Sequence, residues 1–101
     1  MVKKLERSVE GSFTRACKNR KVWCIKFGIR ALPDVFVLLR TGRIVFVEFK
    51  RPGEKPRPNQ KARIRKLRKF NFQVEVVDNN AEALALAKTL SEENNQASRQ
   101  R

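Results

Sequence analysis

Two short apolar runs, separated by four residues, constrain the fold of this chain more than any other feature. Residues 35–39 and 44–47 are rich in β-branched and aromatic side chains, and Gly42 lies between them. This pattern predicts a β-hairpin. A three-residue loop over residues 40–42 favours glycine at its third, left-handed position. That loop places Asp34 opposite Glu48, whereas a two-residue turn at Thr41-Gly42 would place it opposite Phe49.

Charged residues stand at the open end of this hairpin. Pro33-Asp34 precedes the first run and Glu48-Phe49-Lys50 ends the second. Alternate side chains of a strand share a face, so Glu48 and Lys50 point to the same side. Charges at the end of a buried strand are costly unless they have partners or a task. Two carboxylates beside a lysine suit a Mg²⁺ or Mn²⁺ ion, which can activate water to attack a phosphodiester.

The rest of the chain predicts an α/β fold with a small mixed sheet flanked by helices. Apolar residues recur at helical spacing near the N-terminus, and Pro58 suits the first position of a later helix, whose Ile64 and Leu67 face the core. The connection from Lys50 through that helix makes the last strand parallel to the strand that carries Glu48. We expect helices at 3–20, 58–70 and 81–90, and strands at 22–27, 34–39, 44–50 and 74–77.

The chain has 101 residues, which is enough for one domain, expected over residues 1–90. The polar composition of residues 91–101 predicts a flexible C-terminal tail. No apolar run is long enough to span a membrane, and no apolar segment follows the N-terminal residues as in a secretion signal. We therefore expect a cytoplasmic protein that is not secreted.

The two cysteines and three of the aromatic residues are expected to pack in the hydrophobic core. Cys17 and Cys24 are interpreted as small buried hydrophobic residues. Because the chain contains no histidine, zinc sites of the usual Cys/His kinds are excluded for a single chain. Trp23, Phe27 and Phe36 are expected to pack in the core rather than to stack on bases.

The net charge of +14 indicates a polyanionic partner. Residues 1–74 carry a balance of +16 and residues 75–101 a balance of −2. Nucleic acid is favoured over an anionic membrane surface, because no basic amphipathic segment has a wide apolar face. Six basic and no acidic residues lie between Lys61 and Lys69, more than solubility requires. The predicted DNA-binding residues are Lys61, Arg65, Lys66, Arg68, Lys69, Arg51, Lys55 and Arg57.

The motif and its surroundings resemble the virus-type replication-repair nuclease (VRR-NUC) branch of the PD-(D/E)xK nuclease superfamily. Pro33-Asp34 and Glu48-Phe49-Lys50 match its two-part motif, Pro52-Gly53 its following loop, and Gln60 the glutamine that opens its next helix. The resemblance covers residues 6 to about 78. It implies a restriction-endonuclease-like αβββαβ core.

The resemblance also implies a metal site. Asp34 and Glu48 would coordinate Mg²⁺ or Mn²⁺, with the backbone carbonyl of Phe49 as an additional ligand. A glutamate of the first helix would join them directly or through water. Glu10 fits this role best, with Glu6, one turn earlier, as the competitor.

Two further residues receive roles from the resemblance. Lys50 would orient or activate the attacking water, or stabilise charge at the phosphate. Gln60 lies on the stripe of Ile64 and Leu67 and therefore faces inward, where it can position Lys50, a metal ligand or the phosphate. The competing interpretation makes Asp34 a turn residue, and Glu48 with Lys50 an exposed pair at a strand end.

The function implied is a metal-dependent, structure-selective DNA endonuclease that resolves branched DNA such as four-way junctions. It would act in DNA repair as a homodimer in a bacterial or phage-infected cell, without a nucleotide cofactor or a membrane partner. One alternative is a nickase or flap-type nuclease of similar chemistry. Another is a non-catalytic basic module that binds nucleic acid.

Overall fold

The structure is a computed structural model that describes residues 2–26 and 28–99, with side chains for residues 9–26 and 28–97. The described elements follow the order αβββαβα, as predicted. The helices are α1 (Val2–Asn19), α2 (Pro58–Lys69) and α3 (Asn80–Arg99), and the strands are β1 (Trp23–Lys26), β2 (Val35–Leu38), β3 (Ile44–Phe49) and β4 (Gln73–Val77). Among the described helices, none is both long and apolar enough to cross a membrane.

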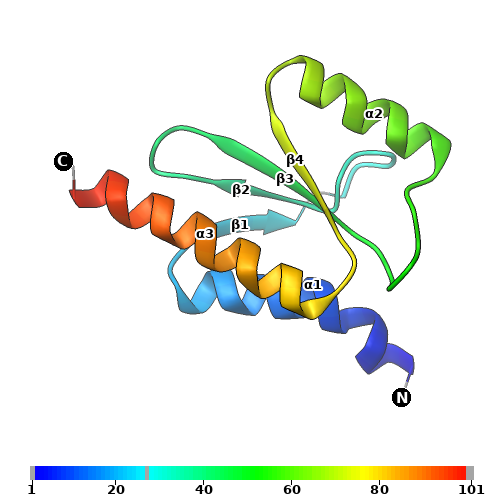
Figure 1. Cartoon of the computed structure of the whole chain (residues 1–101), viewed down its shortest axis with the longest axis horizontal. Coiled ribbons are helices and arrows are strands. Elements are labelled where there is room, and N and C mark those ends of the chain that lie inside the picture. The colour runs from blue at the N-terminus through cyan, green and yellow to red at the C-terminus, as the bar shows by residue number, and fades with distance from the viewer. Residues whose placement is uncertain (1, 27, 100–101) are drawn as a thin grey trace.

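The strands form one mixed sheet in the order β1-β2-β3-β4. The pairs β1–β2 and β2–β3 are antiparallel, and β3–β4 is parallel, which confirms the predicted crossover through α2. Helices α1 and α3 lie together on one face of the sheet, while α2 lies beside β4 at the other side (Figure 1). This is the α/β class with a mixed sheet flanked by helices.

Strand alternation explains which face of the sheet is the core. Val35 and Val37 of β2, with Val45 and Val47 of β3, are fully buried against α1 and α3. The alternate residues of the same strands, among them Phe46 and Glu48, therefore point to the face on which α2 packs. The hairpin thus buries its valines on one side and carries Glu48, a predicted site residue, on the other.

The hairpin loop is the predicted three-residue loop. The Gly42 N–H donates to the Leu39 carbonyl at 2.9 Å, and the Leu39 N–H donates to the Arg43 carbonyl at 2.9 Å. Gly42 has a φ of +92°, the left-handed conformation that this position requires. Val35 pairs with Val47, so the register places the preceding Asp34 opposite Glu48.

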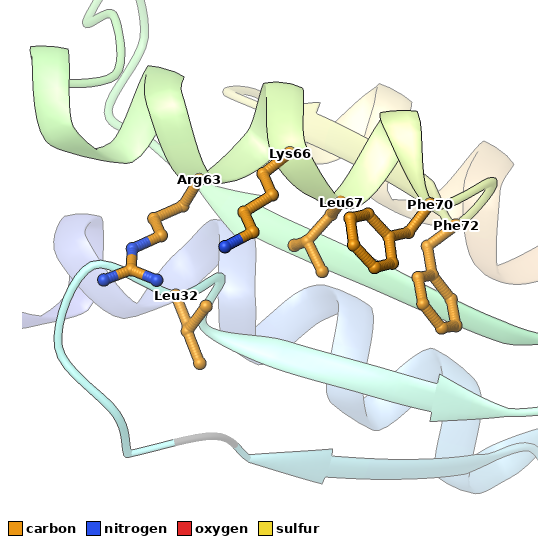
Figure 2. A pocket seen from close by; sticks show the side chains of 6 residues that line it. All are labelled: Leu32, Arg63, Lys66, Leu67, Phe70 and Phe72. Carbon is orange, nitrogen blue, oxygen red and sulfur yellow. The ribbon is translucent and has the colours of Figure 1, made fainter.

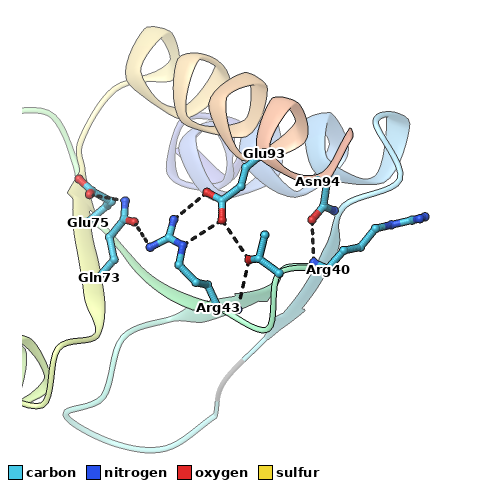
Figure 3. Close-up of polar contacts among 7 residues, drawn as sticks. Arg40, Arg43, Gln73, Glu75, Glu93 and Asn94 are labelled. Carbon is cyan, nitrogen blue, oxygen red and sulfur yellow. Dashed lines mark hydrogen bonds and ion pairs between the residues drawn. The ribbon is translucent and has the colours of Figure 1, made fainter. Parts of the chain in front are cut away.

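Helix α3 continues to Arg99, nine residues beyond its predicted end at residue 90. Ser91 and Asn94 are buried, and Asn94 Oδ1 accepts a hydrogen bond from the Arg40 N–H at 2.9 Å. Glu93 accepts two hydrogen bonds from the Arg43 guanidinium, at 2.9 and 2.8 Å (Figure 3). The polar residues that suggested a solvated tail instead bind the second half of α3 to the hairpin loop.

The prediction that Trp23 lies in the core is also wrong, since its side chain is 65% exposed. Trp23 begins the edge strand β1. The side chain of the next residue, Cys24, points to the opposite face of the strand and packs on the core. Phe36 is half-buried, with its ring centroid 6.2 Å from that of Phe46, and Phe27 lies outside the described residues. Cys17 is buried and both cysteines are free thiols, in agreement with their expected packing role.

Candidate active site

The hairpin brings Asp34 and Glu48 together at its open end. Asp34 directly precedes β2, and its Oδ2 accepts a hydrogen bond from the Phe49 N–H at 2.8 Å. This bond holds the Asp34 carboxylate against the end of β3, next to Glu48. Phe49 is also the residue whose backbone carbonyl the family resemblance implies as a metal ligand.

Glu48 is only 2% exposed, which is unusual for a carboxylate. Its Oε2 lies 3.0 Å from Lys50 Nζ and accepts a hydrogen bond from Gln60 Nε2 at 3.1 Å. The Lys50 ammonium donates to Gln60 Oε1 at 2.7 Å, so the three side chains form a closed triangle. The Lys50 N–H also donates to the Val77 carbonyl at 2.9 Å, which fixes this residue beside β4. An exposed pair at a strand end is therefore ruled out for Glu48 and Lys50.

Burial raises the pKa of the Glu48 carboxyl above its ordinary value. The hydrogen bond from Lys50 opposes this shift, and the negative charge of Asp34 adds to it. Two neighbouring carboxylates of which one is buried form a site in which a cation is favourable.

Gln60 reaches the site because of how α2 begins. Pro58 occupies the first turn, where its missing N–H costs nothing. Gln60 Oε1 also accepts the Arg57 N–H at 3.1 Å, an N-terminal capping contact. The side-chain oxygen of Gln60 thus accepts hydrogen bonds from both the helix N-terminus and Lys50. Its side-chain nitrogen donates to Glu48.

Glu10 is placed differently from the other predicted residues. Its Oε2 lies 3.2 Å from Lys26 Nζ, at the end of β1. Within the described residues, no three His, Cys, Asp or Glu side chains gather closely enough to hold a metal ion. Glu10 as a ligand therefore stays a prediction, and the side chain of its competitor Glu6 lies outside the described residues. The partner Lys26 was not predicted, because a helix–strand contact of this kind leaves no local sequence signal.

The predicted DNA-binding residues are all exposed, in α2 and in the loop before it. Lys61 and Arg65 line a cavity between α2 and β4, next to Val76. Arg68 is partly structural, since its guanidinium donates to the Val74 carbonyl at 2.7 Å. We call these eight residues the basic surface. Two of them, Arg57 and Lys61, flank Gln60 in the sequence, so the basic surface adjoins the carboxylate site.

The donor set fits a hard divalent cation. Asp34 and Glu48 offer carboxylate oxygens, which Mg²⁺ and Mn²⁺ prefer. Mg²⁺ is commonly held by one or two carboxylates together with water and substrate phosphate, so two protein carboxylates are a sufficient anchor.

Comparisons with known proteins point to the family that the sequence motif resembles. The sequence model of the VRR-NUC domain matches residues 10–81. The chain is 47% identical over 51 residues to a protein of Acyrthosiphon pisum secondary endosymbiont phage 1 named "Putative nuclease p44", covering 50% of this chain and 55% of the relative. The chain therefore spans about half the length of the curated relative that it matches.

A solved structure described as a VRR_NUC domain superimposes with a TM-score of 0.73 at 28% sequence identity. The superposition covers 84% of this chain and 95% of that chain. The family match includes the hairpin, Lys50 and Gln60, which are the residues from which the site is built. The chain belongs to the VRR-NUC domain family.

Proposed function

We propose that this protein is a metal-dependent, structure-selective DNA endonuclease that hydrolyses phosphodiester bonds. The observation that carries the proposal is the triangle of Glu48, Lys50 and Gln60 beside Asp34. A non-catalytic binding module would gain nothing from two carboxylates where it meets phosphates, because they repel the ligand unless a cation intervenes. Membership of the VRR-NUC family and the nuclease name of the phage relative support the same chemistry.

Asp34 and Glu48 would hold Mg²⁺ or Mn²⁺, with the Phe49 carbonyl and Glu10 as further ligands. When bound, such an ion polarises the phosphate and makes a coordinated water acidic enough to attack. Glu48 is held by Lys50 and Gln60, and Asp34 by the Phe49 N–H, so both carboxylates are oriented in advance.

Lys50 is the proposed catalytic cation. Its ammonium lies in the same small space as the carboxylates, fixed by Gln60 at 2.7 Å. From this position it can orient the attacking water or stabilise negative charge on the phosphate. Gln60 is the proposed positioning residue, because it contacts both Lys50 and Glu48.

Branched DNA, with the four-way junction as the leading case, is the proposed substrate. The exposed basic residues in α2 and the preceding loop would contact phosphates, which report DNA shape rather than sequence. A homodimer would present two sites related by a twofold axis and cut two strands symmetrically. The phage source of the relative supports action in an infected bacterial cell. A nickase or flap-type nuclease would use the same site on a different substrate.

The test is cleavage of four labelled substrates: a four-way junction, a flap, a plain duplex and a single strand. Each is incubated with Mg²⁺, with Mn²⁺ or with EDTA. Asp34→Asn and Lys50→Ala are the inactivating variants, and Lys88→Ala, on the exposed surface of α3, is the matched charge control.

Junction cutting that needs metal, is lost in both variants and persists in Lys88→Ala is the expected result. If only another substrate is cut, that substrate would replace the junction in the proposal, and the proposed site residues would stand unchanged. Tight binding without cutting under either metal would overturn the proposal in favour of a binding module. Sedimentation of the same preparations tests the dimer.

A further inference from the structure

A second cavity lies on α2, away from the carboxylates. It has a volume of about 200 Å³ and is lined by Leu32, Arg63, Lys66, Leu67, Phe70 and Phe72. Figure 2 shows the side chains from α2 extending toward Leu32, which lies on the loop before β2. The volume is below the about 300 Å³ at which sites for drug-sized ligands begin, so the cavity suits a single small planar group.

The lining combines aromatic carbon with positive charge. Phe70 is 66% exposed and Phe72 is 37% exposed, although both are large apolar side chains. Phe72 is braced from behind by Phe46, edge-on at 88° with ring centroids 5.6 Å apart, so it offers a rigid wall. Arg63 and Lys66 stand at the rim, and the described lining residues include no acidic one. Exposed apolar surface edged by charge of one sign is typical of a binding site.

The cavity and the carboxylate site share two structural elements. Leu32 comes two residues before Asp34, and Arg63 comes three residues after Gln60 on the same helix. Gln60 and Leu67 are seven residues apart, which is about 10 Å along the helix axis.

We propose that this cavity binds an unpaired nucleobase of the DNA substrate, close to the phosphate that is cut. The base would stack on Phe70 and Phe72, and its flanking phosphates would contact Arg63 and Lys66. This inference rests on the proposed function and adds to it a reason for selecting branched DNA, since a base inside an intact duplex cannot enter the cavity. A second copy of the chain is a poorer occupant, because a twofold contact centred on the cavity would bring its cations together.

The test measures binding in EDTA, so that nothing is cut. The probes are a forked duplex with 2-aminopurine at each of the first four unpaired positions and a fully paired duplex of equal length. Phe70→Ala is the main variant because the ring is exposed and its loss should spare the fold. Phe70→Trp should restore stacking, and Leu84→Ala, an exposed apolar residue on α3, is the matched control.

We expect Phe70→Ala to lower the affinity for the fork by about 5- to 100-fold, with the duplex affinity unchanged. Quenching of 2-aminopurine should be stronger at one unpaired position than at the others. It should persist in Leu84→Ala and disappear in Phe70→Ala. Equal affinity losses for fork and duplex, or no loss, would overturn the proposal. So would a shift from dimer to monomer in Phe70→Ala, which would assign the cavity to protein contact. Absence of cutting by the wild type with Mg²⁺ or Mn²⁺ would overturn the nuclease proposal separately.

Discussion

Gln60 donates a hydrogen bond from its side-chain Nε2 to Oε2 of the buried Glu48 at 3.1 Å, and so ties the start of α2 to the end of β3. The carbonyl oxygen of the same amide accepts from Lys50 Nζ at 2.7 Å. One amide therefore sets the relative position of the proposed metal ligand and the proposed catalytic cation. A residue with this role is expected to affect turnover more than substrate binding.

Replacing Gln60 with alanine should lower kcat by about 10- to 100-fold, the usual cost of removing a residue that orients a metal ligand. KM for DNA should change little, because Gln60 is not one of the basic residues on the surface. Steady-state cleavage with Mg²⁺ at varied DNA concentration measures kcat and KM, with the melting temperature recorded alongside.

Asn59→Ala is the matched control for Gln60→Ala. Asn59 Oδ1 accepts the Gln60 N–H at 2.9 Å, so this change disturbs the same helical turn without touching Glu48 or Lys50. If both variants lose equal kcat and equal stability, the role of Gln60 is only to stabilise the N-terminus of α2.

The basic surface of α2 predicts a measurable change in salt dependence. Lys61→Ala and Arg65→Ala should each reduce the slope of log K against log salt by about 0.9 for duplex DNA, because each removes one phosphate contact. Lys88→Ala removes the same charge from α3 and should leave the slope unchanged. A reduction shared by all three variants would mean that net charge, not contact, governs binding.

What the sequence predicts well here is local in origin. The three-residue loop follows from the placement of Gly42, and once it is set, strand pairing brings Asp34 opposite Glu48. The inward direction of Gln60 follows from the helical period that it shares with Ile64, which is buried. Each of these inferences needs only neighbouring residues and a known repeat.

The failures come from contacts between distant segments. The polar composition of residues 91–99 placed the end of the last helix at residue 90. The helix continues to Arg99, and Glu93 accepts a hydrogen bond from Arg43, fifty residues away in the sequence. Trp23 is apolar and lies in a strand, yet β1 is the edge of the sheet, so its side chain is exposed. The ion pair of Glu10 with Lys26 likewise joins distant segments and leaves no signal in a local repeat, while the role of Glu10 as a metal ligand stays a prediction.

Gly42 offers a test of the hairpin that sets the site. Gly42→Ala should destabilise the protein by about 1–2 kcal/mol, because alanine is strained at a φ of +92° although nothing lies within 4 Å of the added Cβ. Gly28→Ala is the matched control, since its Cβ also has open space and its φ is not in the left-handed range. Urea unfolding measures both, and equal stabilities for the two variants would contradict the strain argument.

The bond between Glu93 and Arg43 predicts a pH-dependent contribution to stability. The hydrogen bond from Arg43 lowers the pKa of the Glu93 carboxyl below its ordinary value of 4.5, against a smaller opposing effect of burial. A carboxyl whose pKa is lower in the folded state stabilises the fold above its unfolded pKa. That contribution is lost as the pH falls through the folded-state pKa.

Glu93→Gln should therefore lower the free energy of unfolding by about 0.5–1 kcal/mol at pH 7. The value is modest because the Arg43 side chain is 46% exposed and that of Glu93 is 27% exposed. The difference between wild type and variant should shrink as the pH falls below 4.5, where the wild-type carboxylate gains a proton. Urea unfolding from pH 7 to pH 3 measures the difference, with Glu92→Gln at the exposed preceding position as the matched control. A constant difference for Glu93→Gln over this range would mean that the carboxylate charge does not hold α3 to the hairpin.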